Sequence, residues 1–276
     1  MHLVVQAPRL SDADVAELLR FTAAERAIRL GEGAVRLPDV TPTATIAGFC
    51  DTRRFDHAFV PPERTRDRVG LVAMDMDSTL ITIECIDEIA DIQGIKPQVA
   101  AITASAMRGE IDFAQSLRRR VGLLAGLDTA ALERVYAERL RLSPGAEAML
   151  AAFKAVGAKT MLVSGGFTFF TDRLRARLGL DYTASNVLEE ADGKLTGRVL
   201  GGIVDAAVKA DAVRRMREVP AMADKLIVGI GDGANDLPML AIADVSVAYH
   251  AKPVVRERAM CRIDYCGLDA VVNLFV

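Results

Sequence analysis

Two carboxylates that stand close together in this sequence could do chemistry. Asp75 and Asp77 come directly after the apolar run Val69–Met74 and are two residues apart. Side chains at positions i and i+2 point the same way while a chain is extended, so both acids can face one point. Two negative charges held together require a cation between them, or the pKa of one acid rises until it binds a proton. Taken alone, the same pair is also typical of an acidic turn that leads into a helix.

A second acidic loop makes the first more informative. After the apolar run Leu226–Ile230, two carboxylates and an amide follow in the stretch Gly231-Asp232-Gly233-Ala234-Asn235-Asp236. Oxygen-rich loops of this kind suit a hard cation such as Mg²⁺, which proteins bind through carboxylates together with waters and a phosphate. The glycines also fit the spacing of a dinucleotide-binding loop. We favour the cation, because acids stand where the pyrophosphate would lie and no acid ends the next apolar run, Val245–Tyr249.

Groups that could bind a phosphate lie between these two loops. The apolar run Thr160–Val163 is followed by Ser164, Gly165 and Gly166, and then by a helical pattern from about Thr168. A hydroxyl and glycine N–H groups at the entrance of a helix can cradle a phosphate. An ordinary glycine-containing turn between a strand and a helix would have the same sequence.

Lys209 is a further candidate. It falls in the first turns of a helix that should begin near Asp205, where a cation works against the helix dipole. This unfavourable placement points to a use elsewhere, although a solvated lysine on a helix face is commoner.

These groups need a common scaffold. The apolar runs are continuous and alternate with helical stretches, which indicates a parallel sheet with helices on both faces. Ligands bind at the carboxyl edge of such a sheet, so the loops should meet there. The helical stretch between the first two strands is too long for one crossover, and we expect an inserted helical subdomain at about residues 84–143. Its expected helices are Glu84–Gln93, Pro97–Met107, Phe113–Leu124 and Thr129–Leu140.

The first 68 residues differ from the rest. The polar, proline-bearing stretch Pro61–Arg68 is typical of a linker, so we expect one domain at residues 1–68 and another at residues 69–276. The first should be a small α+β domain, an incomplete ferredoxin-like or ACT-like fold, with a role in dimerisation or regulation as the hypothesis. Its expected elements are strands at Leu3–Gln6, Ile28–Leu30, Val35–Leu37 and Phe59-Val60 and a helix that opens at Ser11.

Composition excludes several classes of protein. Of the 276 residues, 51% are apolar and 26% charged, and the net charge is -3. The apolar content excludes a disordered chain, and the charge argues against a basic surface for nucleic acid or anionic lipid. Four cysteines without C-x-x-C spacing and three histidines argue against a zinc site or a disulfide scaffold. No run reaches the ~18 apolar residues of a membrane span and the N-terminus lacks a signal-peptide pattern, so the expected compartment is the cytoplasm.

Four segments, taken together and in order, resemble the motifs of the haloacid dehalogenase superfamily of phosphohydrolases. The resemblance covers about Gly70 to the C-terminus. It implies an α/β fold with a doubly wound parallel-sheet core at residues 69–276, interrupted by a helical cap at about residues 84–143. The motifs specify the superfamily and leave the substrate open. They are Asp75-Met76-Asp77-Ser78-Thr79, Ser164-Gly165-Gly166, Lys209 and Gly231-Asp232-Gly233-Ala234-Asn235-Asp236.

Two further segments, in the expected helical insertion, resemble the phosphoserine phosphatases within that superfamily. The finer resemblance implies an Mg²⁺-dependent hydrolysis of O-phospho-L-serine to L-serine and phosphate through an aspartyl-phosphate, which is the final step of serine biosynthesis. The segments are Glu84-Cys85-Ile86-Asp87-Glu88-Ile89-Ala90 and Phe113-Ala114-Gln115-Ser116-Leu117-Arg118-Arg119-Arg120-Val121.

The resemblance also implies a role for each motif residue. Asp75 would be the nucleophile, and Asp77 would protonate the leaving serine oxygen and later deprotonate the hydrolytic water. Mg²⁺ would be held by Asp75, the backbone carbonyl of Asp77 and Asp232, with Asp236 nearby. The residues that would bind the substrate are Glu84, Arg120, Ser164, Gly165, Lys209 and Asn235.

Recognition of phosphoserine requires an anion for its ammonium and a cation for its carboxylate, which by resemblance are Glu84 and Arg120. In a helical projection at about 100° per residue, Arg120 falls within the apolar stripe of its helix, whereas Arg118 and Arg119 point elsewhere. A guanidinium on the buried side needs a partner, and a ligand carboxylate would serve. The arginine run could also be a solvated or nucleic-acid-facing patch, which fits Arg118 and Arg119. Glu84 could simply be an acid in the first turn of a helix, where it is favoured anyway.

Two alternatives remain at the level of the sequence. A phosphotransferase, or a phosphatase for another small phosphomonoester such as phosphohomoserine, would carry the same motifs. A non-catalytic binding or regulatory module would not need the complete set of acids, hydroxyl and amine. The expected partner is a small phosphomonoester, with no nucleic acid and no membrane, and a homodimer through the N-terminal domain is a further hypothesis.

Overall fold

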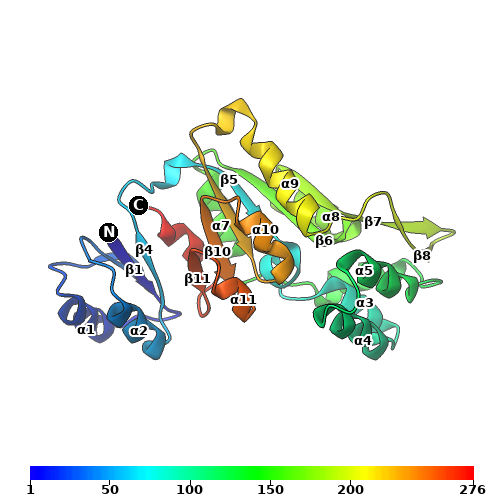
Figure 1. Ribbon diagram of the computed structural model, residues 1–276, viewed down its shortest axis with the longest axis horizontal. Coiled ribbons are helices and arrows are strands. Elements are labelled where there is room, and N and C mark those ends of the chain that lie inside the picture. Colours follow the sequence, from blue (N-terminus) through cyan, green and yellow to red (C-terminus); the bar gives the residue numbers. More distant parts are fainter.

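The computed structural model describes residues 1–276, which form two β-sheets (Figure 1). A four-stranded antiparallel sheet belongs to the N-terminal unit, and a seven-stranded, mostly parallel sheet forms the centre of the second unit. The N-terminal unit lies at one end of the molecule and the inserted helices lie toward the other (Figure 1). This α/β core with a small antiparallel N-terminal sheet is the fold class that the sequence predicts.

The N-terminal unit contains six elements in the order βαββαβ. Its strands follow the spatial order β2-β3-β1-β4, and two helices pack on one face of the sheet. The structure therefore differs from the expectation of an incomplete fold, because the ferredoxin-like set of elements is complete. The elements are β1 (His2–Gln6), α1 (Asp12–Thr22), β2 (Ile28–Gly31), β3 (Ala34–Leu37), α2 (Ala44–Arg53) and β4 (Asp56–Val60).

Local capping explains where the two helices of this unit begin. The Ser11 hydroxyl accepts a hydrogen bond from the N–H of Asp14 (3.2 Å), and the Asp14 carboxylate accepts one from the N–H of Ser11 (2.9 Å), which is a capping box. At α2, the Thr43 hydroxyl accepts a hydrogen bond from the N–H of Ile46 (3.2 Å). Helix α2 is not predicted from the sequence, since its apolar residues form no clear stripe.

The large sheet has the strand order β11-β10-β9-β5-β6-β7-β8. All neighbouring strands are parallel except β7 and β8, which form an antiparallel hairpin. The four strands predicted from continuous apolar runs are present, and every residue of β5 and β10 is buried. The strands are β5 (Val69–Met74), β6 (Lys159–Phe167), β7 (Tyr182–Ala191), β8 (Lys194–Leu200), β9 (Leu226–Gly231), β10 (Val245–Tyr249) and β11 (Cys261–Ile263).

Helices cover both faces of this sheet, as the continuous apolarity of its strands requires. On one face, α7 (Ala146–Lys154) and α8 (Thr168–Leu178) pack against alternate side chains of β5. On the other face lie α9 (Ala206–Arg217), α10 (Leu237–Leu240) and α11 (Pro253–Arg256).

The helical insertion leaves the sheet after β5 and returns before β6. The segment that leads into the insertion and the segment that leads out of it lie side by side at a β-bridge between Ile81 and Leu142, so the insertion has a narrow stem. We call it the cap. It consists of α3 (Cys85–Ile92), α4 (Lys96–Met107), α5 (Phe113–Gly122), α6 (Ala130–Arg134) and the π-helical turn η3 (Val135–Arg139).

The second face of the small sheet packs on the large unit. Val4 and Val60 belong to the same apolar core as Val271 and Leu274 of the last 3-10 helix, η6 (Leu268–Leu274). The two units are therefore joined by a packed interface as well as by the connecting segment.

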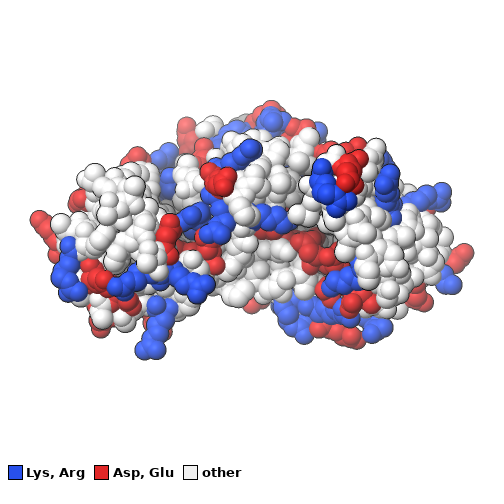
Figure 2. Space-filling model, turned by 60° about the horizontal axis from the view of Figure 1, so that its bottom comes forward, with Lys and Arg blue, Asp and Glu red and all other residues white.

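The outside of the molecule carries mixed charge. On the face shown in Figure 2, acidic side chains are interspersed among the basic ones. None of the helices combines the length and the apolar character that crossing a membrane requires.

Candidate active site

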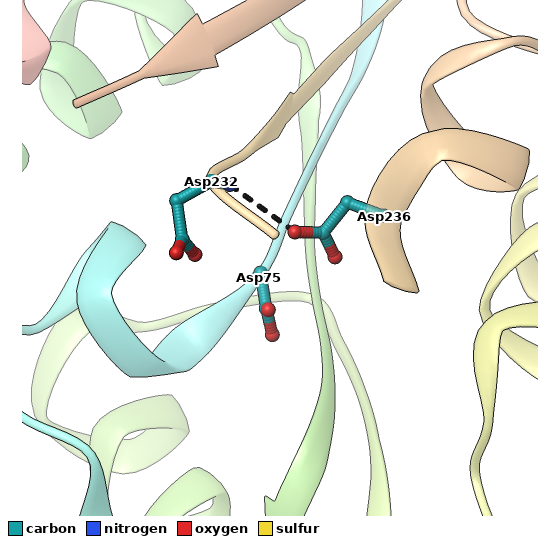
Figure 3. Close-up of side chains that lie close together, drawn as sticks. All are labelled: Asp75, Asp232 and Asp236. Carbon is teal, nitrogen blue, oxygen red and sulfur yellow. Dashed lines mark hydrogen bonds between the residues drawn. The ribbon is translucent and has the colours of Figure 1, made fainter. Parts of the chain in front are cut away.

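The carboxyl edge of the large sheet brings the two acidic loops together. Asp75 follows β5 and Asp232 follows β9, and these two strands are neighbours in parallel register. Reactive oxygen atoms of Asp75, Asp232 and Asp236 lie within 4.8 Å of one another, and all three residues are buried (Figure 3). Three buried carboxylates this close together repel one another, so a cation has to compensate their negative charge.

Lys209 compensates part of this negative charge. It extends from α9 into the cluster, where its Nζ lies 2.8 Å from Asp75 Oδ1 and 2.9 Å from Asp236 Oδ1. Only 1% of its surface is exposed, so the alternative of a solvated lysine does not hold. Burial opposes the charge of Lys209, but the attraction of Asp75 and Asp236 outweighs it and raises the pKa above its ordinary value. The cluster therefore has three carboxylates and one ammonium, so its negative charge is not fully compensated and a further cation would be favourable.

Asp236 forms hydrogen bonds that hold the neighbouring groups in place. Its second carboxylate oxygen accepts hydrogen bonds from the N–H of Asp232 (3.1 Å) and the N–H of Gly233 (3.0 Å). Since its other oxygen binds Lys209, Asp236 fixes both the second acidic loop and the ammonium. Thr79 orients Asp232, because its hydroxyl donates to Asp232 Oδ1 at 3.1 Å.

The pKa values of Asp75, Asp77 and Asp232 are raised above their ordinary values. Burial, with the charge of Asp236 added, raises the pKa of Asp75 well above its ordinary value, although Lys209 opposes the shift. Burial and the charge of Glu84 raise the pKa of Asp77 to about 7, so this acid can hold or release a proton near neutrality. Burial and the charges of Asp236 and Glu84 raise the pKa of Asp232 to about 6.

Ser164, Gly165 and Gly166 lie near the carboxyl end of β6, beside these acids. The Ser164 hydroxyl accepts a hydrogen bond from the N–H of Gly166 (2.8 Å), so its own proton is free to be donated elsewhere. A Cβ on Gly166 would lie 2.9 Å from an Asp77 carboxylate oxygen, which explains why a glycine is needed at this close approach.

Asn186, a buried residue of β7, belongs to the site although no sequence motif predicts it. Its Nδ2 donates to the carbonyl of Gly165 (2.8 Å), and its Oδ1 accepts from the N–H of Val204 (2.9 Å). Asn186 therefore supports the Gly165 peptide and the segment that precedes the helix of Lys209. A lone asparagine in a strand is the only sequence signal, and it does not identify partners that are distant in the chain.

A cavity of about 720 Å³ separates this edge from the cap. Asp75, Asp77 and Asp232 line it from the core, and Glu84 and Arg120 line it from the cap. The predicted residues Gly165 and Asn235 also line it. Ser164 and Lys209 are buried and contact two lining residues, Gly166 and Asp75 respectively.

The two charged cap residues differ in their surroundings. Glu84 is exposed and accepts a hydrogen bond from the Ser78 hydroxyl (2.8 Å). Arg120 is half-buried, burial lowers its pKa, and its Nε has no hydrogen-bond partner. Arg118 and Arg119 are exposed, as the helical projection predicts. An unpaired guanidinium aimed at a cavity is suited to a ligand carboxylate.

The comparison with protein families decides the membership of this chain. The family model of haloacid dehalogenase-like hydrolases matches residues 72–241, which include the second half of β5, the cap and both acidic loops. The chain belongs to this family. A phosphoserine phosphatase from Polaromonas sp. is 54% identical over 209 residues, which are 74% of this chain and 89% of that protein.

Solved structures extend the likeness to the whole hydrolase chain. A probable phosphoserine phosphatase from Vibrio cholerae, in its unliganded form, superposes with a TM-score of 0.86 at 38% identity over 99% of this chain and 85% of that one. A phospho-aspartyl intermediate analogue of a phosphoserine phosphatase superposes with a TM-score of 0.69 at 36% identity over 76% of this chain and 100% of that one. The first of these likenesses includes the N-terminal unit of this hydrolase.

Proposed function

We propose that this hydrolase is a phosphoserine phosphatase, which converts O-phospho-L-serine to L-serine and phosphate as the final step of serine biosynthesis. One observation carries the substrate: a single cavity is bounded by buried acids on the core and by an anion and an unpaired guanidinium, Glu84 and Arg120, on the cap. Phosphoserine offers an ammonium and a carboxylate to those two groups and its phosphate to the core. The names of the relatives agree with this assignment.

The reaction divides between the two carboxylates of the first acidic loop. Asp75 attacks phosphorus and becomes an aspartyl-phosphate, while Asp77 donates a proton to the leaving serine oxygen. Asp77 then takes a proton from the water that hydrolyses the acyl phosphate. A pKa of about 7 suits Asp77 to both directions of proton transfer. The Ser164 hydroxyl, the Gly165 N–H, Lys209 and Asn235 bind the phosphoryl oxygens and stabilise their charge.

The donor set fits Mg²⁺, because this ion prefers carboxylate oxygens as ligands. Three carboxylates share only one ammonium, so negative charge is left to bind the ion. Asp75, Asp232 and the main-chain carbonyl of Asp77 would hold the ion, and Asp236 would orient Asp232. Bound there, the ion supplies positive charge that offsets the repulsion between the Asp75 carboxylate and the anionic phosphate.

Removal of divalent metal should abolish hydrolysis, and Mg²⁺ should restore it. Added Mg²⁺ should also raise the unfolding temperature of the wild type, because a ligand that binds the folded state stabilises it. This shift should be smaller in Asp232→Asn and unchanged in Asp211→Asn, a control on the exposed face of α9. Equal shifts in the wild type and Asp232→Asn, measured by thermal unfolding, would place the ion elsewhere.

Replacing Arg120 by Ala should raise KM for phosphoserine by about 10- to 10²-fold, since a charge-assisted hydrogen bond worth roughly 1.5–3 kcal/mol is lost. A phosphomonoester without a carboxylate, such as phosphoethanolamine, should show a much smaller change. Arg119→Ala is the matched control, because Arg119 is exposed on the same helix. Steady-state kinetics on both substrates would contradict the role of Arg120 if both KM values rose equally.

The substrate assignment is tested by phosphate release from a panel of phosphoserine, phosphohomoserine, phosphothreonine and sugar phosphates in the presence of Mg²⁺. We expect the highest kcat/KM for phosphoserine. A preference for phosphohomoserine would retain the reaction and change the substrate. A complete lack of turnover by the wild type would instead favour a non-catalytic binding module.

The remaining assignments concern the chain as a whole. We place a domain boundary in residues 61–68 and the protein in the cytoplasm, where its four free cysteines would stay reduced.

We also propose that the N-terminal unit forms the contact of a homodimer. The exposed apolar side chains of Phe21 and Ile28 and the free edge of β2 support this contact. A monomeric mass in solution, measured by sedimentation, would remove the dimer.

A further inference from the structure

A buried carboxylate joins the N-terminal unit to the second unit. Asp56, the first residue of β4, is 3% exposed. Its Oδ1 accepts a hydrogen bond from the N–H of Asp264 (2.7 Å), and its Oδ2 accepts from the N–H groups of Tyr265 (3.0 Å) and Cys266 (2.9 Å). One side chain of the N-terminal unit thus binds three consecutive peptides of the second unit.

This arrangement is strong and specific. Consecutive N–H groups that converge on one anion form a compact anion-binding nest, and hydrogen bonds to a charged acceptor are stronger than neutral ones. Without the carboxylate, the three half-buried N–H donors would lose their partner. Asp56 therefore fixes the conformation of the segment 264–266, which we call the docking loop.

The docking loop in turn holds the segment that follows β10. The ring Nε2 of His250 lies 2.9 Å from the carbonyl oxygen of Cys266, and the N–H of His250 donates to the carbonyl of Ile263 (2.8 Å). His250 has a φ of 44°, a conformation that a residue with a side chain adopts rarely unless its surroundings impose it. On the other side, the Asp264 carboxylate binds Arg256 of α11 at 2.8 Å.

Between these two attachments lies part of the wall of the active-site cavity. Lys252, Pro253 and Val254 line the cavity, and the N–H of Lys252 donates to the main-chain carbonyl of Asp232 (2.9 Å). The docking loop holds this segment at residue 250 and at residue 256, so a shift of the loop would move the wall. The reacting groups on the loop after β5, on β6 and on α9 are held by other contacts.

We propose that Asp56 is a positioning residue for the active site, through which the N-terminal unit sets the placement of residues 250–256. The N-terminal unit is then part of what shapes the substrate cavity. The kinetic part of the test rests on the proposed function, whereas its hydrogen-exchange part does not.

The test compares Asp56→Ala and Asp56→Asn with the wild type, as full chains, at a temperature where each is folded by circular dichroism. In Asp56→Ala, KM for phosphoserine should rise on the order of fivefold while kcat stays within about twofold. The wall moves, whereas Asp75 and Asp77 lie on another loop and Asp232 is still held by Asp236 and Thr79. Hydrogen exchange in the peptide 249–256 should become faster. Asp56→Asn keeps one acceptor oxygen, so its effects should be smaller, and it replaces Asp56→Ala if that variant does not fold.

Arg262→Ala is the matched control. Arg262 of β11 forms an ion pair with Asp51 of α2, so its loss also removes a contact between the units but leaves the nest intact. Its KM and its exchange in 249–256 should equal those of the wild type. A folded Asp56→Ala with wild-type exchange in 249–256 or a wild-type KM would overturn the proposal, as would Arg262→Ala with the same effects. If the wild type does not hydrolyse phosphoserine, the proposed function fails and the exchange data alone decide the role of Asp56.

Discussion

Replacing Asp75 with Asn is expected to lower kcat/KM for phosphoserine by about 10⁴-fold or more, since the variant has no carboxylate to attack phosphorus. Asn can still accept the hydrogen bond that Asp75 Oδ1 receives from the N–H of Met76 (2.7 Å), so the loop should keep its shape. Phosphate release measures the loss. Acid quenching with ³²P-labelled substrate should leave label on the wild type and none on the variant.

A comparison with Asp77→Asn separates the two carboxylates. This variant lacks the proton donor, so it should lose more activity on phosphoserine than on p-nitrophenyl phosphate, whose leaving group departs without a proton. Asp75→Asn should be inactive on both substrates. If Asp75→Asn, with an unfolding temperature close to that of the wild type, still turned over phosphoserine and still became labelled, Asp75 would not be the nucleophile.

The parts of the fold that the sequence predicts are those that local patterns specify. A strand buried on both faces has to be apolar throughout, so Val69–Met74 and Val245–Tyr249 match β5 and β10 to the residue. Ser11 marks the start of α1 because its capping partner lies three residues away. The acidic loops meet because each follows a neighbouring parallel strand. Resemblance indicates Arg120 as the cap arginine that faces the cavity, and helical periodicity supports that choice over Arg118 and Arg119.

Contacts between distant residues account for what the sequence does not predict. The position of Lys209 suggests only an unfavourable helix dipole, and its burial follows from Asp75 and Asp236, which come from two other elements. The sequence of β7 gives no indication that Asn186 will form a hydrogen bond with the Gly165 peptide. The apolar residues of α2 form no stripe, so only its cap at Thr43 could have indicated a helix. In the same way, Asp56 looks like any polar residue at the start of a strand until β4 is placed beside residues 264–266.

Replacing Lys209 with Met should affect both activity and stability. The side chain of Lys209 is 1% exposed and pairs with two carboxylates that are 8% and 0% exposed. Removing one partner of a buried ion pair costs about 3–5 kcal/mol of unfolding free energy, because the remaining charges stay buried. Loss of the ammonium should also lower kcat by about 10²- to 10³-fold, since positive charge on the transferring phosphoryl group is lost. Urea unfolding with a chelator present and steady-state kinetics with Mg²⁺ measure the two effects.

The destabilisation of Lys209→Met should depend on pH in a defined direction. Lys209 lowers the pKa of Asp75 in the folded protein, so its removal raises that pKa further above the unfolded value. A group whose pKa is raised by folding favours the folded state when protonated, and this advantage is lost as pH rises through the folded-state pKa. The difference in unfolding free energy between the wild type and Lys209→Met should therefore be smaller at pH 5 than at pH 8. The control Lys159→Met, which removes a surface partner of Asp181, should change stability little at either pH. A pH-independent loss in Lys209→Met would mean that packing of the lysine stem, and not its charge, holds the cluster together.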